Sequence, residues 1–252
     1  MCYGDSITAG SDEADPAHSY PGELQRLRPD FEVVNEGRDG DVSGNVARFE
    51  AALAEWPPDV VVLMLGTNDA VCTPTATEGC DEAATPEKAA ANLLRMADAA
   101  RKVGAKVLVL TPPPSVCKAN CDSRNEIAYA MWMRDAFTGR LADVLRHTRT
   151  PRNVRIADLR SRLSDASWST LSTNGLHPST EGNRMIARFV AAYMPPRTKP
   201  RTVEARRDER RRGDTRPRDE TRRHEPNRRS TRSATSDANP FARQPLDPRY
   251  AR

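Results

Sequence analysis

The chain has 252 residues and a formal net charge of +4. No apolar run approaches the roughly 20 residues that a membrane-spanning helix needs. Residues 197–252 hold 18 of the 39 basic residues but 9 of the 35 acidic ones, so their net charge is +9 and that of residues 1–196 is −5. The basic segment has few large apolar residues and cannot bury enough surface to offset the entropy lost on ordering. We therefore expect one folded domain over residues 1–196 and a disordered, Arg-rich tail over residues 197–252.

The first 196 residues alternate short apolar or β-branched runs with segments of helical character. Residues 60–65 form a continuous apolar run, which is typical of a strand buried on both faces of a parallel sheet. The strands that we expect lie at residues 1–3, 31–34, 60–65, 107–110 and 154–156. The helices that we expect lie at residues 19–28, 42–55, 85–104, 123–147 and 179–194. This alternation predicts an α/β fold with a parallel sheet.

Three of these helices carry start signals. Thr85 is a typical N-cap, and Pro86 then occupies the first helical position. Residues 123–126 read as a capping box that opens with Ser123. Ser179 begins the last expected helix.

Polar residues follow the expected strands at the edge where parallel α/β sheets form their sites. Ser6 stands between a strand end and a helix start, so its hydroxyl can face outward and its N–H stays available. Gly40 has no side chain and can bring its N–H close to a ligand. Asn68 offers a neutral amide donor, and His177 is a base of the type that titrates near neutrality. Acyl transfer needs such a set: a nucleophile, a base and donors for an oxyanion.

These residues lie in blocks that resemble the SGNH (GDSL-like) hydrolase superfamily of esterases and lipases. In chain order the blocks are GDSIT at residues 4–8, Asn35 with Gly40, GTND at residues 66–69, and His177 with Pro178. The resemblance implies a flavodoxin-like three-layer α/β/α sandwich with a five-stranded parallel sheet.

The resemblance also implies a serine hydrolase that cleaves an acyl ester and needs no cofactor or metal. Ser6 would be the nucleophile and His177 the general base. The N–H groups of Ser6 and Gly40 and the side chain of Asn68 would form the oxyanion hole. Gly37 is the competing glycine in the second block.

The sequence departs from the family pattern at Asn174, where an aspartate is expected three residues before the histidine. Asn174 can present its Oδ1 to the imidazole N–H of His177, which orients the ring without a charge. Alternatively, a backbone carbonyl orients His177 and leaves a Ser–His dyad, or the protein has weak or no activity. We favour the first two interpretations. Asp158 and Asp165 are substitute acids in principle, but no spacing supports either.

Four of the five cysteines form two close pairs, Cys72 with Cys80 and Cys117 with Cys121, and Cys2 is left over. Their spacings differ from those of the usual zinc-binding pairs, so local disulfides are favoured over free thiols or zinc. Disulfides indicate an oxidising compartment, so a secreted or periplasmic location is suspected although no signal peptide is visible. Because only three residues precede the nucleophile block, we expect the natural chain to start upstream.

Functions of other classes fit parts of the sequence. A catalytically weakened binding protein for acylated sugars or lipids would account for Asn174. A protein that binds nucleic acid or an anionic surface would use the Arg-rich tail, but interspersed acidic residues favour a solvated tail without a partner. Four histidines do not supply the His-rich ligand set of a metallophosphoesterase. We expect a small-molecule, lipid or carbohydrate ester as the partner, and a monomer as the assembly.

Overall fold

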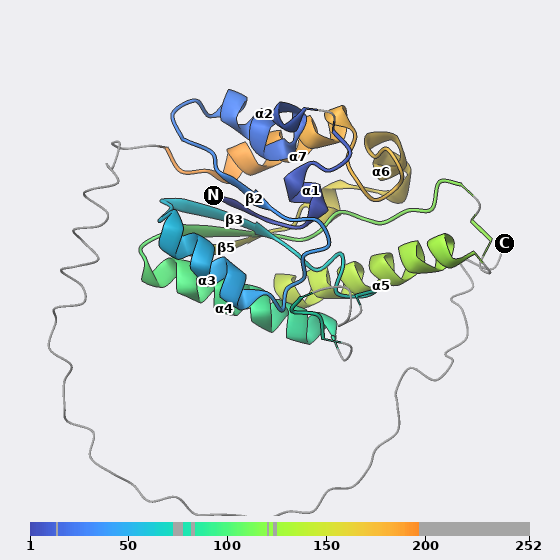
Figure 1. Cartoon of the computed structure of the whole chain (residues 1–252), viewed down its shortest axis with the longest axis horizontal. Coiled ribbons are helices and arrows are strands. Elements are labelled where there is room, and N and C mark those ends of the chain that lie inside the picture. Colours follow the sequence, from blue (N-terminus) through green and yellow to red (C-terminus); the bar gives the residue numbers. More distant parts are fainter. Residues whose placement is uncertain (14, 73–77, 82–83, 120, 123–124, 197–252) are drawn as a thin grey trace, which may run out of the picture. The chain divides into compact units, whose positions relative to one another are not determined.

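The computed structural model describes residues 1–13, 15–72, 78–81, 84–119, 121–122 and 125–196 (Figure 1). Our expectations for the Arg-rich tail therefore lie outside the described residues. None of the helices in the described ranges is long and apolar enough to cross a bilayer.

Five parallel strands form one sheet in the order β2-β1-β3-β4-β5. The strands are β1 (Cys2–Gly4), β2 (Asn35–Gly37), β3 (Val60–Met64), β4 (Lys106–Leu110) and β5 (Val154–Ala157). All five residues of β3 are buried, as its continuous apolar run predicts. The direction of winding changes between β1 and β3, and doubly wound sheets bind ligands at such a point.

The strand expected at residues 31–34 is wrong in position, because β2 begins at Asn35. Its register pairs Cys2 with Asn35 and Gly4 with Gly37. The apolar residues before Asn35 lead into the strand, and the carbonyl of Val34 accepts a hydrogen bond from the N–H of Cys2 at 2.8 Å. Pairing with β1, rather than β propensity, sets the position of this short edge strand.

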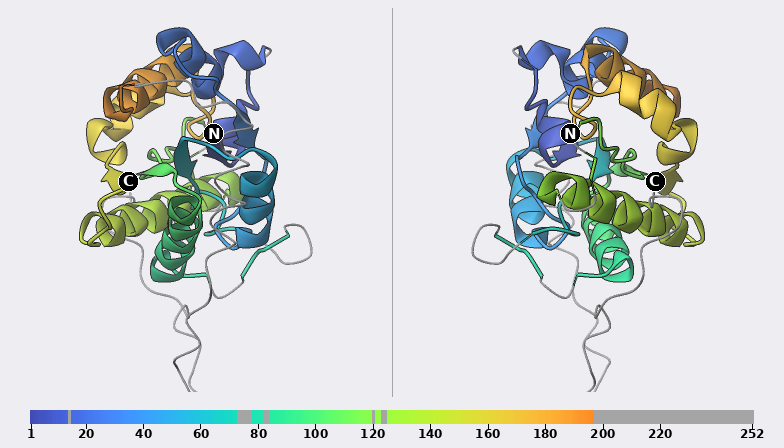
Figure 2. Two further views of the ribbon diagram at one scale, coloured as in Figure 1. Left: turned by 90° about the vertical axis from the view of Figure 1, so that its left-hand side faces the viewer. Right: turned by 90° about the vertical axis from the view of Figure 1, so that its right-hand side faces the viewer.

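Helices cover both faces of the sheet and complete the three-layer α/β/α sandwich that was predicted (Figures 1 and 2). On one face lie α3 (Val46–Glu55), α4 (Pro86–Lys102) and α5 (Glu126–Arg146). On the other lie α1 (Ser6–Ala9), α2 (Tyr20–Leu27), α6 (Asp165–Leu171) and α7 (Thr180–Tyr193). Each face has its own apolar core, which includes Phe49 and Leu93 on the first side and Trp168 and Ile186 on the second.

Two of the three expected helix starts are confirmed. The side chain of Thr85 accepts a hydrogen bond from the N–H of Lys88, and that of Ser179 accepts one from the N–H of Gly182. The third expectation is wrong, because α5 begins at Glu126 with Asn125 as its N-cap. Asn125 accepts from two backbone N–H groups of the first turn, and Ser123 lies outside the described residues. Helix α6 was not expected at all.

Asp5 caps the short helix α1 and is fully buried. Its Oδ1 accepts a hydrogen bond from the N–H of Ile7 at 3.0 Å, whereas its Oδ2 has no partner within the described part of the chain. Burial raises the pKa of Asp5 to about 7, although the N–H of Ile7 favours the ionised form. An aspartate in an unfolded chain titrates near pH 4, so the folded protein takes up a proton at Asp5 between about pH 4 and pH 7.

We predict that Asp5→Asn raises the free energy of unfolding at pH 8 by about 2–4 kcal/mol. The raised pKa means that the contribution of Asp5 to stability is present below pH 4 and is lost as the pH rises toward 7. The amide keeps an acceptor for the N–H of Ile7 and has no charge to lose. Urea unfolding of both proteins from pH 4 to pH 8 measures the difference, and two parallel stability curves would contradict the prediction.

Candidate active site

Ser6 lies where β1 turns into α1, at the carboxyl edge of the sheet. It is the first residue of α1, and its Oγ lies 2.9 Å from Nε2 of His177. Gly4 must be a glycine for this turn to close, since a Cβ there would lie 2.1 Å from Oγ1 of Thr8 and 2.5 Å from the carbonyl oxygen of Met64. The Ser6 side chain therefore emerges from a tightly packed turn.

His177 lies in the loop that leads into α7, and several contacts fix this loop. Gly175 has a φ of +89°, and a Cβ there would lie 1.8 Å from the carbonyl oxygen of Val116. The Gly175 carbonyl accepts hydrogen bonds from the N–H of Val116 at 2.9 Å and from Nε1 of Trp168 at 3.1 Å. Lys118 donates to the carbonyl of Ser172 at 2.8 Å. The loop after β4 and the Trp168 side chain of α6 together hold the His177 loop in place opposite Ser6.

Asn174 contacts His177, but not in the way that the sequence suggested. Its Oδ1 accepts hydrogen bonds from the backbone N–H groups of Leu176 and His177, at 3.0 and 2.9 Å. Its Nδ2 lies 3.1 Å from Nδ1 of His177 and donates to Oδ2 of Asp12 at 3.1 Å. The acceptor of the Asn174 amide thus bonds the backbone, and its donor faces the imidazole.

Asp12 is the site residue that the sequence analysis did not identify. Its Oδ1 lies 3.1 Å from Nδ1 of His177, on the side of the ring away from Ser6. The two substitute acids considered above do not take this place: Asp158 pairs with Arg146 at 2.8 Å, and Asp165 lies in the first turn of α6. Only the folded chain brings residues 12 and 177 together, so no spacing in the sequence reports the pair.

Gly40 and Asn68 lie on neighbouring loops of the same edge. Gly40 has a φ of +72°, and nothing lies within 4 Å of the position of a Cβ there. Asn68 donates from Nδ2 to the carbonyl oxygen of Asp41 at 3.1 Å, which ties its loop to the Gly40 turn. Gly37 differs from Gly40: a Cβ there would lie 2.1 Å from the backbone nitrogen of Ala9, and its N–H bonds Oδ1 of Asn35. Gly37 therefore serves the packing of β2 against α1.

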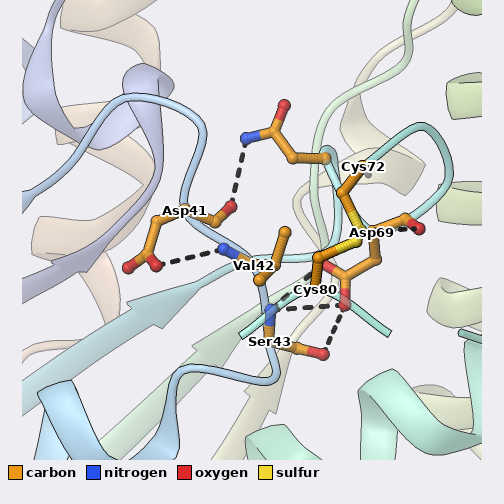
Figure 3. The surroundings of a disulfide bond; sticks show 7 residues. Asp41, Val42, Ser43, Asp69, Cys72 and Cys80 are labelled. Carbon is orange, nitrogen blue, oxygen red and sulfur yellow. Dashed lines mark hydrogen bonds between the residues drawn. A yellow bond between two sulfur atoms is a disulfide. The ribbon is translucent and has the colours of Figure 1, made fainter. Parts of the chain in front are cut away.

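Two buried acidic residues hold these loops in place. Asp41 accepts hydrogen bonds from Nδ2 of Asn45 at 2.7 Å and from Nη2 of Arg48 at 2.9 Å. Asp69 accepts from the N–H and the hydroxyl of Ser43, as Figure 3 shows. Burial raises the pKa of the Asp69 carboxyl, and its hydrogen bonds to Ser43 act in the opposite direction. Asp41 thus holds the loop after β2 to the start of α3, and the Asp69 carboxylate joins the loop after β3 to it.

The structure joins the cysteines in the two local pairs that the sequence favoured. The Cα atoms of Cys72 and Cys80 lie 5.8 Å apart, and those of Cys117 and Cys121 lie 5.7 Å apart. The first bridge lies beside Asp69 and Ser43 (Figure 3). The second follows Val116, which bonds the His177 loop. Cys2 is free and buried in β1.

Comparison with known proteins agrees with the fold and identifies the family. TesA, an esterase of Pseudomonas aeruginosa, is 38% identical over 115 residues, which are 44% of this chain and 52% of TesA. The match thus spans about half the length of TesA. An arylesterase of Vibrio mimicus is 26% identical over 197 residues, which are 76% of this chain and 85% of that protein.

A carbohydrate acetylesterase family member from Sinorhizobium meliloti has the same fold, with a TM-score of 0.57 at 22% identity over 76% of this chain and 94% of that one. The profile of the GDSL-like lipase/acylhydrolase family matches residues 2–185. The chain therefore belongs to the GDSL-like lipase/acylhydrolase family.

Proposed function

We propose that this chain hydrolyses a carboxylic ester, with Ser6 as the nucleophile and His177 as the general base. The observation that carries the proposal is the distance of 2.9 Å between Oγ of Ser6 and Nε2 of His177. A nucleophile within hydrogen-bond reach of a base is the arrangement that covalent acyl transfer requires. Membership of a family of lipases and acylhydrolases supports the same reaction class.

The reaction proceeds in two steps. Oγ of Ser6 attacks the acyl carbon while its proton passes to Nε2 of His177, and the carbonyl oxygen becomes an oxyanion. When this intermediate collapses, His177 gives the proton to the departing alcohol oxygen and the acyl group stays on Ser6. His177 then takes a proton from water, whose oxygen attacks the acyl carbon, and Ser6 leaves with that proton as the carboxylic acid is released.

The oxyanion would be held by Ser6, Gly40 and Asn68. In the described ranges, neither the N–H of Ser6 nor that of Gly40 has an acceptor. Asn68 uses one amide hydrogen on the Asp41 carbonyl, which leaves the second for a ligand. Preorganised donors of this kind supply about 3–4 kcal/mol each to transition-state stabilisation in other hydrolases.

The proposed substrate class is a small acyl ester. The two relatives described above are named as an esterase and an arylesterase, and the structural neighbour is named as a carbohydrate acetylesterase family member. An ester bond is what these names share. The interpretation as a weakened binding protein depended on the missing acid at position 174. The carboxylate of Asp12 beside His177 supplies a negative charge at that place, so the hydrolase is favoured.

We predict that Ser6→Ala lowers kcat for p-nitrophenyl acetate by about 10³-fold or more, because the nucleophile is removed. The variant should also lose covalent labelling by a fluorophosphonate, which needs no particular alcohol group. Ser161→Ala is the matched control, since this exposed hydroxyl donates only to the carbonyl of Asp158. A folded Ser6→Ala variant with wild-type turnover would refute the proposed nucleophile.

We predict that Gly40→Ala lowers kcat/KM by about tenfold or more, because a methyl group would crowd the N–H that faces the oxyanion. Gly104→Ala is the matched control, as Gly104 also has a positive φ (+88°) and nothing within 4 Å of a Cβ position. Both substitutions should cost about 1 kcal/mol of stability through backbone strain. Equal activity in the two variants would remove Gly40 from the proposed oxyanion hole.

A further inference from the structure

Asp12 lies where its carboxylate can orient His177, the role that the family pattern gives to an aspartate at position 174. We propose that Asp12 is the positioning residue of this site: it holds His177 with the proton on Nδ1, so that Nε2 is free to accept the proton of Ser6. This inference rests on the proposed ester hydrolysis. It assigns the acidic role to the loop after α1, more than 160 residues from the histidine that it orients.

The contacts around the imidazole separate its two neutral forms. If Nε2 accepts from Ser6, the single proton of neutral imidazole is on Nδ1 and needs an acceptor there. The Oδ1 of Asp12 lies 3.1 Å from Nδ1, whereas the other polar neighbour at 3.1 Å is an amide nitrogen, Nδ2 of Asn174, which can only donate. A carboxylate facing a bare Nδ1 lone pair would be repelled, so the anion favours the form with the proton on Nδ1.

The orientation of the Asn174 amide is fixed by its other partners. A flipped amide would point its NH₂ at the backbone N–H groups of Leu176 and His177 and its oxygen at Oδ2 of Asp12. Each of these contacts would then join two donors or two acceptors. Asn174 therefore cannot be the acceptor for Nδ1–H, and its role is to hold Asp12.

Asp12 itself is held at both carboxylate oxygens. Oδ2 accepts from the hydroxyl of Thr173 at 2.6 Å and from Nδ2 of Asn174 at 3.1 Å, which leaves Oδ1 directed at the imidazole. The next residue, Glu13, accepts from Thr180 and Asn183 and so fastens this loop to α7. The Asp12 side chain is 31% exposed and His177 is 18% exposed, so the charge is not taken fully out of water.

The same contacts predict what happens when the side chains at positions 12 and 174 are exchanged. In the exchange variant, a carboxylate oxygen replaces Nδ2 of Asn174, which lies 3.1 Å from Nδ1 of His177, so this nitrogen gains an acceptor. The amide at position 12 can donate to the new carboxylate, so the contact between positions 12 and 174 keeps one donor and one acceptor. The carboxylate at 174 can still accept from the two backbone N–H groups. The single change Asn174→Asp is a poorer test, because it places two carboxylates about 3 Å apart, where like charges raise one pKa.

The experiment compares Asp12→Asn, the exchange variant Asp12→Asn/Asn174→Asp, the control Asp15→Asn and wild type. The readouts are p-nitrophenyl acetate hydrolysis with kcat and KM resolved, and thermal unfolding. We expect Asp12→Asn to lower kcat by about 10²-fold or more with little change in KM, since the acid-to-amide change in a serine protease triad costs about 10⁴. The kcat of the exchange variant should be at least tenfold higher than that of Asp12→Asn. Asp15→Asn is the matched control, because it removes the same charge three residues away at an exposed side chain whose amide can still accept from the N–H of Ala17. Its kcat should stay within about twofold of wild type.

Three results would overturn the inference. In the first, Asp12→Asn keeps wild-type kcat while Ser6→Ala is inactive, which leaves the proposed hydrolysis intact. In the second, the exchange variant folds like Asp12→Asn and regains nothing, so that Asp12 has only a structural role. In the third, wild type neither hydrolyses esters nor reacts with a fluorophosphonate, and the proposed function fails as well.

Discussion

The contact between Oγ of Ser6 and Nε2 of His177 is the interaction on which this site depends, and 171 residues separate its partners. Each partner comes from one end of the folded body, so the contact requires both ends to be fixed on the same sheet face. Residues of α2 and α7, including Leu24 and Ile186, share one apolar core there. Trp168 in the same core donates to the Gly175 carbonyl and thereby connects core packing to the histidine loop.

The loops that carry Gly40 and Asn68, the proposed oxyanion donors, are held by polar groups whose burial costs free energy. Asp41 is compensated by Arg48 and Asp69 by Ser43, whereas Asp5 retains an oxygen without a partner in the described residues. These three carboxylates follow β1, β2 and β3 at the carboxyl edge, where the loops must meet. Burial raises the pKa of Asp5 and of Asp69, so these two carboxyls weaken the protein at neutral pH. The hydrogen bonds of Asp41 and Asp69 hold the loops that carry Gly40 and Asn68. Perturbed acids of this kind gather at functional sites more often than elsewhere.

Features that depend on neighbouring residues could be predicted from the sequence. The apolar run of β3 and the caps of α4 and α7 are local signals, and the order of polar residues after the strands predicted that Ser6 and His177 share one edge. The position of β2 could not be predicted, because pairing with β1 sets it. Helix α6 has only two large apolar residues, Trp168 and Leu171, which are too few to form a periodic pattern. Asp12 could not be found because its relation to His177 exists only through the packing of the loop after α1 against the loop before α7.

We propose that a carboxylate outside the family pattern, that of Asp12, determines which nitrogen of the His177 imidazole carries the proton. Nitrogen-15 NMR of labelled protein reports which ring nitrogen carries the proton, and a His177→Gln sample assigns the signal among the four histidines. At a pH where the ring is neutral, we predict a protonated Nδ1 and a bare Nε2 in wild type, and a loss of that preference in Asp12→Asn. A wild-type imidazole with its proton on Nε2, and with Nδ1 accepting from Asn174, would contradict this role of Asp12.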